Sequence, residues 1–75
     1  MRRDEWLAEL CARIGVEPPS DEEVVALLDL AATAAHSSER TAAPLACWVA
    51  GRSDRPAADL GEIAREVAPE GDQAT

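Results

Sequence analysis

The residues best suited to chemistry lie in one polar stretch near the middle of the chain. His36 is the only histidine among the 75 residues, and Arg40 follows four positions later, with Ser37, Ser38 and Thr41 beside them. Arginine presents a forked set of donors that suits a phosphate or a carboxylate. A histidine near the C-terminal end of a helix is favoured in its protonated form. The stretch predicts either a small anion site or a surface turn in which His36 caps a helix and Arg40 pairs with an acid.

The same sequence offers little for catalysis or for metal binding. Cys11, Cys47 and His36 stand on three separate segments, and neither a Cys-x-x-Cys nor a His-x-x-x-His spacing occurs. A structural zinc site needs four ligands in a closed geometry. A serine or cysteine nucleophile would need His36 as its base, yet no glycine-rich loop or oxyanion motif accompanies these residues. We therefore expect no enzyme activity, no metal and no cofactor, and we expect both cysteines to be free thiols on apolar helix faces.

The charge of the chain excludes several classes of partner. Seven arginines, no lysines and 15 acidic residues give a formal net charge of −8. Nucleic-acid affinity comes from clustered basic side chains, so we expect no nucleic-acid partner. The longest apolar stretch, residues 24–35, is interrupted by Asp29 and falls short of the roughly 20 residues that span a bilayer. We expect no membrane partner and a cytoplasmic protein, because acidic residues rather than an apolar segment follow the basic start of the chain.

Hydrophobic periodicity predicts an all-α protein, a compact bundle of four short helices with no strand. The first helix covers about residues 4–14, with Gly15 as its left-handed end and Val16 packing back on it. The second covers about residues 21–36 and begins with a capping box formed by Ser20 and Glu23. Both helices carry their apolar residues at helical spacing.

The third and fourth helices are marked by proline and glycine. The third has Pro44 in its first turn and ends at Gly51. The fourth is capped by Ser53 or Asp54, has Pro56 near its start and stops at Pro69. We expect residues 1–69 to form a single helical domain and residues 70–75 to be a disordered polar tail.

Small residues replace large ones in the expected core. Four alanines lie in the second half of the second helix, where they let another helix approach closely. Trp6 and Trp48 are the only aromatic residues, and we expect them to anchor the core, with Trp48 beside Arg52 as an alternative partner contact. A core this small roughly cancels the entropy cost of folding, so self-association as a homodimer is a further expectation.

A set of residues along the first two thirds of the chain resembles a known family. The shared residues are Trp6-Leu7-Ala8-Glu9-Leu10-Cys11, Leu27-Leu28-Asp29-Leu30-Ala31, Ala35-His36, Arg40, Ala43-Pro44-Leu45 and Gly51. This pattern resembles the DUF6457 family, a small helical domain found mainly in actinobacteria, over roughly residues 4–52. The chain departs from the family pattern at Thr41, where proline is usual, and at residues 46–48, where threonine and phenylalanine are common.

The resemblance implies a setting but no reaction. Members of the family occur alone or appended to molybdenum-cofactor guanylyltransferases of the MobA type. The resemblance therefore implies an accessory role in molybdenum-cofactor biosynthesis, with such a guanylyltransferase as the protein partner. If the family shares a site, the matching positions His36, Arg40, Pro44 and Leu45 are its residues in this chain.

Three hypotheses about function follow from these observations. The first is a non-catalytic interaction module that contacts its partner through the Trp48 and Arg52 region or through the His36 and Arg40 connector. The second is a module for a small anion or nucleotide, held by His36, Arg40 and free backbone N–H groups at the start of the third helix, near Thr41 and Pro44. The third is an acyl-carrier-like protein, which the size and charge suit but the missing Asp-Ser-Leu motif disfavours.

Overall fold

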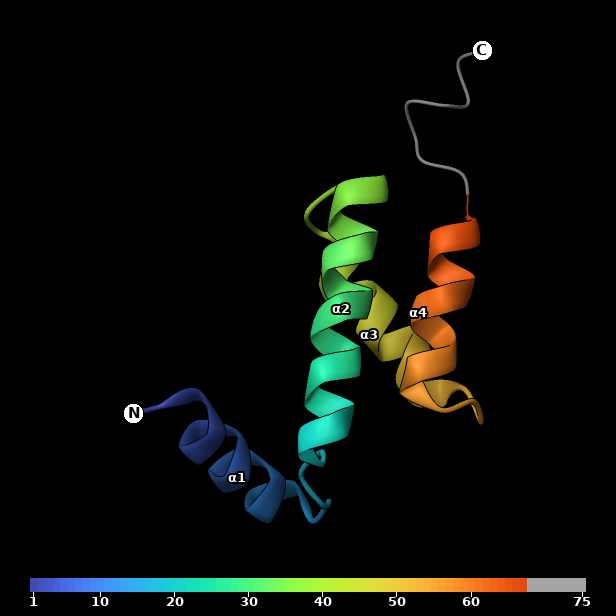
Figure 1. The fold of residues 1–75 in the computed structure, drawn as a ribbon. Helices are drawn as coiled ribbons and strands as arrows, with labels where there is room; N and C mark the ends of the chain where they lie inside the picture. Colours follow the sequence, from blue (N-terminus) through green and yellow to red (C-terminus); the bar gives the residue numbers. More distant parts are fainter. Residues whose placement is uncertain (68–75) are drawn as a thin grey trace.

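The computed structural model describes residues 1–67, and over that range the chain forms four α-helices and no strand (Figure 1). The helices are α1 (Arg3–Ile14), α2 (Asp21–Ser37), α3 (Ala42–Arg52) and α4 (Ala57–Glu66). The predicted all-α fold of four helices is confirmed. The predicted tail at residues 70–75 and the predicted stop at Pro69 lie outside the described residues. Within residues 1–67, no helix is both long enough and apolar enough to cross a membrane.

The C-terminal end of α1 follows its sequence signal. Gly15 has a φ of 77°, in the left-handed region, as predicted. The Cys11 carbonyl accepts hydrogen bonds from the N–H groups of Gly15 at 2.9 Å and of Val16 at 3.0 Å, which satisfies a carbonyl that the helix leaves free. The Val16 residue is 53% exposed, so it is only partly covered.

The N-terminal end of α2 is a complete capping box. The Ser20 hydroxyl accepts a hydrogen bond from the Glu23 N–H at 3.2 Å, and the Glu23 carboxylate accepts one from the Ser20 N–H at 2.8 Å. Asp21, Glu22 and Glu23 occupy the first turn, where negative charge complements the helix dipole. The predicted start of this helix is therefore confirmed.

Two predicted helix ends are wrong. Helix α3 does not stop at Gly51 but continues through Arg52, because only Gly15 among the described residues has a positive φ. Helix α4 is not capped by Ser53 or Asp54. Pro56 takes the cap position, while the Ser53 hydroxyl accepts a hydrogen bond from the Arg55 N–H at 3.0 Å in the preceding turn. Because the Ser53 hydroxyl is bonded within this turn, it does not cap α4, and the helix starts directly after Pro56.

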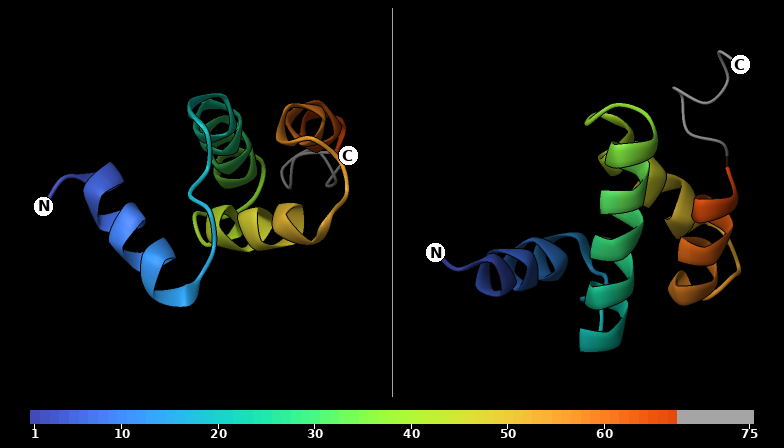
Figure 2. Two further views of the ribbon diagram at one scale, coloured as in Figure 1. Left: turned by 90° about the horizontal axis from the view of Figure 1, so that it is seen from below. Right: turned by 45° about the horizontal axis from the view of Figure 1, so that its top comes forward.

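Helix α2 is the centre of the molecule. Helices α3 and α4 pack against it, whereas α1 projects from its start and makes only minor contacts with the other helices (Figures 1 and 2). The buried hydrophobic residues among those described are Cys11, Leu30 and Ala50. The prediction that both tryptophans anchor the core is wrong, since Trp6 is 55% and Trp48 is 64% exposed.

A glycine brings α4 close to α2. Gly61 is buried, and a Cβ added there would lie 2.9 Å from Oδ2 of Asp29. The same oxygen accepts a hydrogen bond from Nη1 of Arg65 at 2.8 Å. Glycine is unfavourable inside a helix, but at this position its small size gives the Asp29 carboxylate room to lie between the two helices.

Candidate functional site

The polar stretch predicted as a site forms the turn between α2 and α3. His36 lies in the last turn of α2 and Arg40 lies within the turn, and both residues are exposed. Arg40 forms no salt bridge with any residue of the range 1–67, so the predicted pairing with an acid is not formed. At the end of α2 the Ser38 N–H donates to the Ala34 carbonyl at 3.1 Å.

The start of α3 has few free amides to offer an anion. The Ala42 N–H donates to the Glu39 carbonyl at 2.8 Å, and the Ala43 N–H donates to the Arg40 carbonyl at 3.1 Å. Pro44, the third residue of the helix, has no N–H to give. An anion site at a helix N-terminus depends on unbonded N–H groups. The backbone part of the predicted anion site is therefore occupied, although the Arg40 guanidinium stays accessible.

The serines of this stretch lie at the end of a helix. Ser37 is the last residue of α2 and Ser38 is its C-cap. Acyl carriers hold their modified serine at the start of a helix, so this arrangement departs from theirs in position as well as in sequence.

The outward side of α3 carries a continuous apolar stripe. Leu45, Trp48 and Val49 are 66%, 64% and 61% exposed, and Arg52 lies over the Trp48 ring with its guanidinium carbon 4.9 Å from the ring centroid. Their spacing of i, i+3, i+4 and i+7 places all four on one side of the helix. Ala50, on the opposite side, is buried. We call Leu45, Trp48, Val49 and Arg52 the α3 outer surface.

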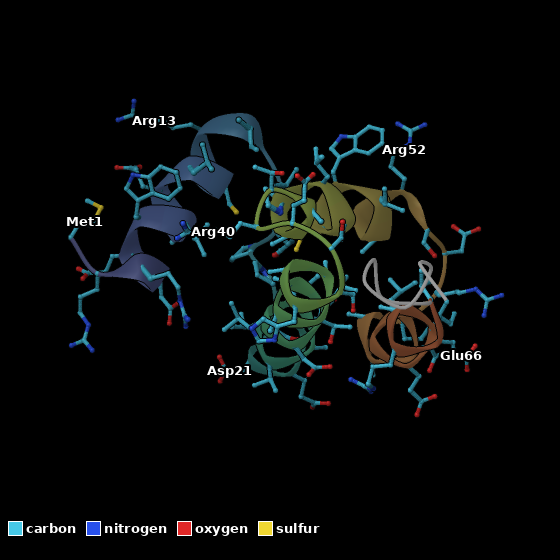
Figure 3. The ribbon with its side chains drawn as sticks, turned by 90° about the horizontal axis from the view of Figure 1, so that it is seen from above. Met1, Arg13, Asp21, Arg40, Arg52 and Glu66 are labelled. Carbon is cyan, nitrogen blue, oxygen red and sulfur yellow. The ribbon has the colours of Figure 1, made fainter. Side chains whose placement is uncertain are left out.

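The six predicted site residues fall into two groups. His36, Arg40, Thr41 and Pro44 lie at or near the turn before α3, whereas Trp48 and Arg52 lie along the helix. The 11 residues of α3 extend over about 16 Å at 1.5 Å per residue, and Arg40 lies before the start of this helix, whereas Arg52 is its last residue. Figure 3 shows the two arginines on different sides of the molecule, with Arg40 toward the side of α1 and Arg52 on the outside of α3. They do not form one site.

Val49 was not among the predicted site residues, and Leu45 was singled out only as a position that matches the family pattern. The spacing of Leu45 and Val49 relative to Trp48 was visible in the sequence, but Cys47 and four alanines make the other sides of α3 apolar as well. A helix that is apolar all round does not reveal which side faces the core. In the structure, α3 packs its small residues against α2 and leaves its large apolar residues exposed to solvent.

The charge on α3 differs from that of the rest of the chain. Its sequence, residues 42–52, contains no acidic residue and ends on Arg52. Helix α1 contains two arginines and three acidic residues, and α4 contains one arginine and three acidic residues. Helix α2 contains four acidic residues and no arginine. In a chain of net charge −8, the α3 outer surface is thus apolar with a positive end.

A surface hollow lies apart from the predicted site residues. It has a volume of ~530 Å³ and lies between the Pro18-Pro19 segment, α2, the C-terminal half of α3 and the start of α4. Within residues 1–67, no group of three or more histidine, cysteine or acidic side chains could hold a metal ion. Both cysteines are free thiols, with Cys11 buried and Cys47 half-buried. The hollow brings together no residues with an evident catalytic role.

Comparison with known proteins gives a family match. The family model DUF6457, described as a domain of unknown function, matches residues 1–73. No curated protein and no solved structure matches the chain. The family match includes all four helices, so it extends the resemblance seen over residues 4–52 to nearly the whole sequence.

Proposed function

This chain belongs to the DUF6457 family of domains of unknown function, and we propose that it is a non-catalytic module that docks a protein partner on the α3 outer surface. The observation that carries the proposal is the exposure of Leu45, Trp48 and Val49, each more than 60% open on one side of one helix. Large apolar side chains that gather on a surface typically mark interaction sites.

The composition of this surface suits a protein interface. Tryptophan and arginine are the residue types most enriched among those that dominate binding energy. Arg52 stacks on Trp48, which orders both side chains before any partner arrives and so lowers the entropy cost of binding. Because α3 contains arginine and no acid, the complementary partner surface is an apolar recess with an acidic rim.

The proposed partner is a molybdenum-cofactor guanylyltransferase, and the proposed setting is the cytoplasm. Support for this partner comes from the family resemblance, which connects some relatives to guanylyltransferases of the MobA type. A domain appended to an enzyme in one chain and separate in another is expected to meet that enzyme as a partner. On this proposal the guanylyltransferase performs the chemistry, and the present chain contributes a binding surface.

Anion or nucleotide binding at Arg40 is the second candidate. The exposed guanidinium of Arg40, which has no salt bridge within residues 1–67, favours it. The occupied amides of Ala42 and Ala43 weigh against it, because they remove the backbone donors that such a site would use. We rank this candidate below the docking module for that reason.

A binding experiment with matched variants tests the docking proposal. Val49 on α3 and Val67 at the end of α4 are both 61% exposed, so aspartate at either position has a similar effect on the free chain. Calorimetry with a purified guanylyltransferase from the same genome is expected to show binding by the wild type and by Val67→Asp. Val49→Asp is expected to bind at least about tenfold more weakly, since it places a charge in the centre of the contact.

The possible failures of this experiment have different meanings. No binding by the wild type, together with an extract capture that returns no cofactor-biosynthesis protein, would reject the guanylyltransferase as partner. Equal binding by Val49→Asp and Val67→Asp would reject the α3 outer surface as the contact, whatever the partner is.

A further inference from the structure

Helix α1 is held to the rest of the chain by a narrow contact. We call α2, α3 and α4 together the body. Cys11 is the one buried residue of α1, and Leu7, four residues earlier on the same side of the helix, is half-buried. Trp6, Leu10 and Ile14 remain exposed. Among the described residues α1 makes only minor contacts with the other helices, so a small part of its surface joins it to the body (Figures 1 and 2).

The contact between α1 and the start of α2 is loosely packed. A surface hollow of ~210 Å³ lies there, lined on one side by Leu7 and Ala8 of α1 and on the other side by Pro18, Pro19 and Val24. Protein cores are close-packed and contain few gaps larger than a water molecule. The junction of α1 with α2 is therefore a contact between two surfaces and not part of a continuous core.

The polar interactions of α1 stay within its own end of the chain. Glu9 pairs with Arg13 at 3.9 Å, one turn apart on the same helix. Within residues 1–67, no hydrogen bond or ion pair joins α1 to α2, α3 or α4. Helix α4, in contrast, is joined to α2 by the ion pair of Arg65 with Asp29 at 2.8 Å. Separating α1 from the body thus breaks no polar contact.

Helix α1 and the body differ in what holds each of them folded. A helix of 12 residues is marginal in water without a packed face. The helices of the body bury Leu30, Ala50 and Gly61 respectively, and they pack against one another through α2. Segments with few buried contacts open at a lower free energy than the core does. The body therefore keeps its own packing when α1 is released.

The connection after α1 can act as a hinge. Gly15 has a φ of 77°, and a Cβ added there would meet no atom within 4 Å, so this residue lies in open space. Val16 and Glu17 are exposed. The two residues that follow are prolines, which restrict the backbone up to the start of α2. Changes of direction are thus concentrated in residues 15–17, and they do not disturb the capping box of α2.

We propose that α1 is an arm that opens and closes on the body about residues 15–17. On opening, Leu7 and Cys11 leave the body and α1 loses its helical structure, while α2, α3 and α4 stay folded. The α3 outer surface lies entirely on the body. The opening of α1 is therefore independent of the proposed docking function and leaves that surface unchanged.

Native-state hydrogen exchange of the full chain, followed by NMR in increasing urea below the unfolding midpoint, tests the arm. The amides of residues 7–14 are expected to be at least about tenfold less protected than the best protected amides of residues 25–36. The protection of α1 is also expected to fall less steeply with urea, because its opening exposes less surface than unfolding of the whole chain. Equal protection of the two helices, or parallel slopes in urea, would overturn the proposal.

Leu30→Ala provides a second readout, because it weakens the body and leaves α1 untouched. It is expected to lower the protection of the α2 amides at least about 30-fold and that of the α1 amides less than about twofold. Alkylation of Cys11 by iodoacetamide, measured by peptide mass spectrometry, is likewise expected to proceed at the wild-type rate. A rise in Cys11 alkylation that parallels the loss of α2 protection would show that α1 opens only when the whole chain unfolds. If circular dichroism shows that Leu30→Ala has lost helix content, the urea series on the wild type decides alone.

Discussion

The Arg52 guanidinium lies over the ring of Trp48, with 4.9 Å between the guanidinium carbon and the ring centroid. Trp48 precedes Arg52 by four residues, about one helical turn. This pair sits on the outside of α3 and not in the core, since the Trp48 side chain remains 64% exposed. The Trp48 side chain, the largest of α3, thus contributes little to packing and lies at the surface in contact with Arg52. That arrangement motivates the proposed docking function and makes the effect of Trp48 on stability predictable.

Trp48→Ala is expected to lower the free energy of unfolding by no more than ~1 kcal/mol, because the variant loses one exposed cation–π contact and little burial. Leu30→Ala is the contrasting variant. Leu30 is 5% exposed, and its truncation is expected to cost ~2–5 kcal/mol. Urea denaturation followed by circular dichroism measures both. A loss at Trp48 as large as that at Leu30 would mean that the tryptophan is part of the core.

Gly61→Ala is expected to be neutral or stabilising despite the burial of this residue. Alanine gains ~1 kcal/mol over glycine inside a helix. The added Cβ pushes against Oδ2 of Asp29, a flexible carboxylate, and disturbs its contact with Arg65. That contact is half-exposed and contributes at most ~1 kcal/mol.

The control for Gly61→Ala is the same substitution made in an Asp29→Ala background. There the carboxylate is absent, so the full helix-propensity gain of ~1 kcal/mol is expected in thermal or urea unfolding. A strong loss of stability in both backgrounds would show that backbone or core atoms, and not the Asp29 carboxylate, limit the approach of α4 to α2.

The capping box of α2 is expected to make a measurable contribution to stability. Ser20→Ala removes the acceptor for the Glu23 N–H and is expected to cost ~1 kcal/mol. Ser20→Asp keeps an acceptor at the cap and serves as the control, with little expected loss. Urea midpoints give the comparison. Equal losses for alanine and aspartate would indicate that the serine hydroxyl is not used as an acceptor.

Phosphate and nucleotides are not expected to raise the melting temperature of the wild type. The first amides of α3 are already bonded to the Glu39 and Arg40 carbonyls, so Arg40 alone would hold the anion. A single exposed charge contact is weak at physiological salt. A saturable rise in melting temperature that disappears in Arg40→Ala would contradict this account and favour the anion-binding candidate.

Local signals in the sequence predicted the helices well. Gly15 and the Ser20–Glu23 box set helix ends through backbone conformation and hydrogen bonds within a few residues, so the sequence alone could reveal them. Gly51 was mistaken for a helix end, because glycine permits a left-handed turn but does not require one. The start of α4 was misplaced because the Ser53 hydroxyl bonds within its own turn.

The candidate surface was harder to predict than the helices. Which side of α3 faces α2 depends on how the two helices pack, and an all-apolar helix does not encode that choice by periodicity. Trp48 and Arg52 were correctly singled out as neighbours. Leu45 was noted only for its match to the family pattern, and Val49 was found only once its exposure was known. The exposure of Trp6 was missed for the same reason, since it depends on where α1 lies in space.

The most direct test of the docking function uses the two tryptophan indole N–H signals of the ¹⁵N-labelled chain. In a titration with unlabelled guanylyltransferase, we predict that the indole signal of Trp48 shifts or broadens, together with the amides of residues 45–52. The indole signal of Trp6 is predicted to stay in place, because Trp6 lies on α1 and is not part of the α3 outer surface. A titration that moves Trp6 and leaves Trp48 unchanged would contradict the proposed docking surface.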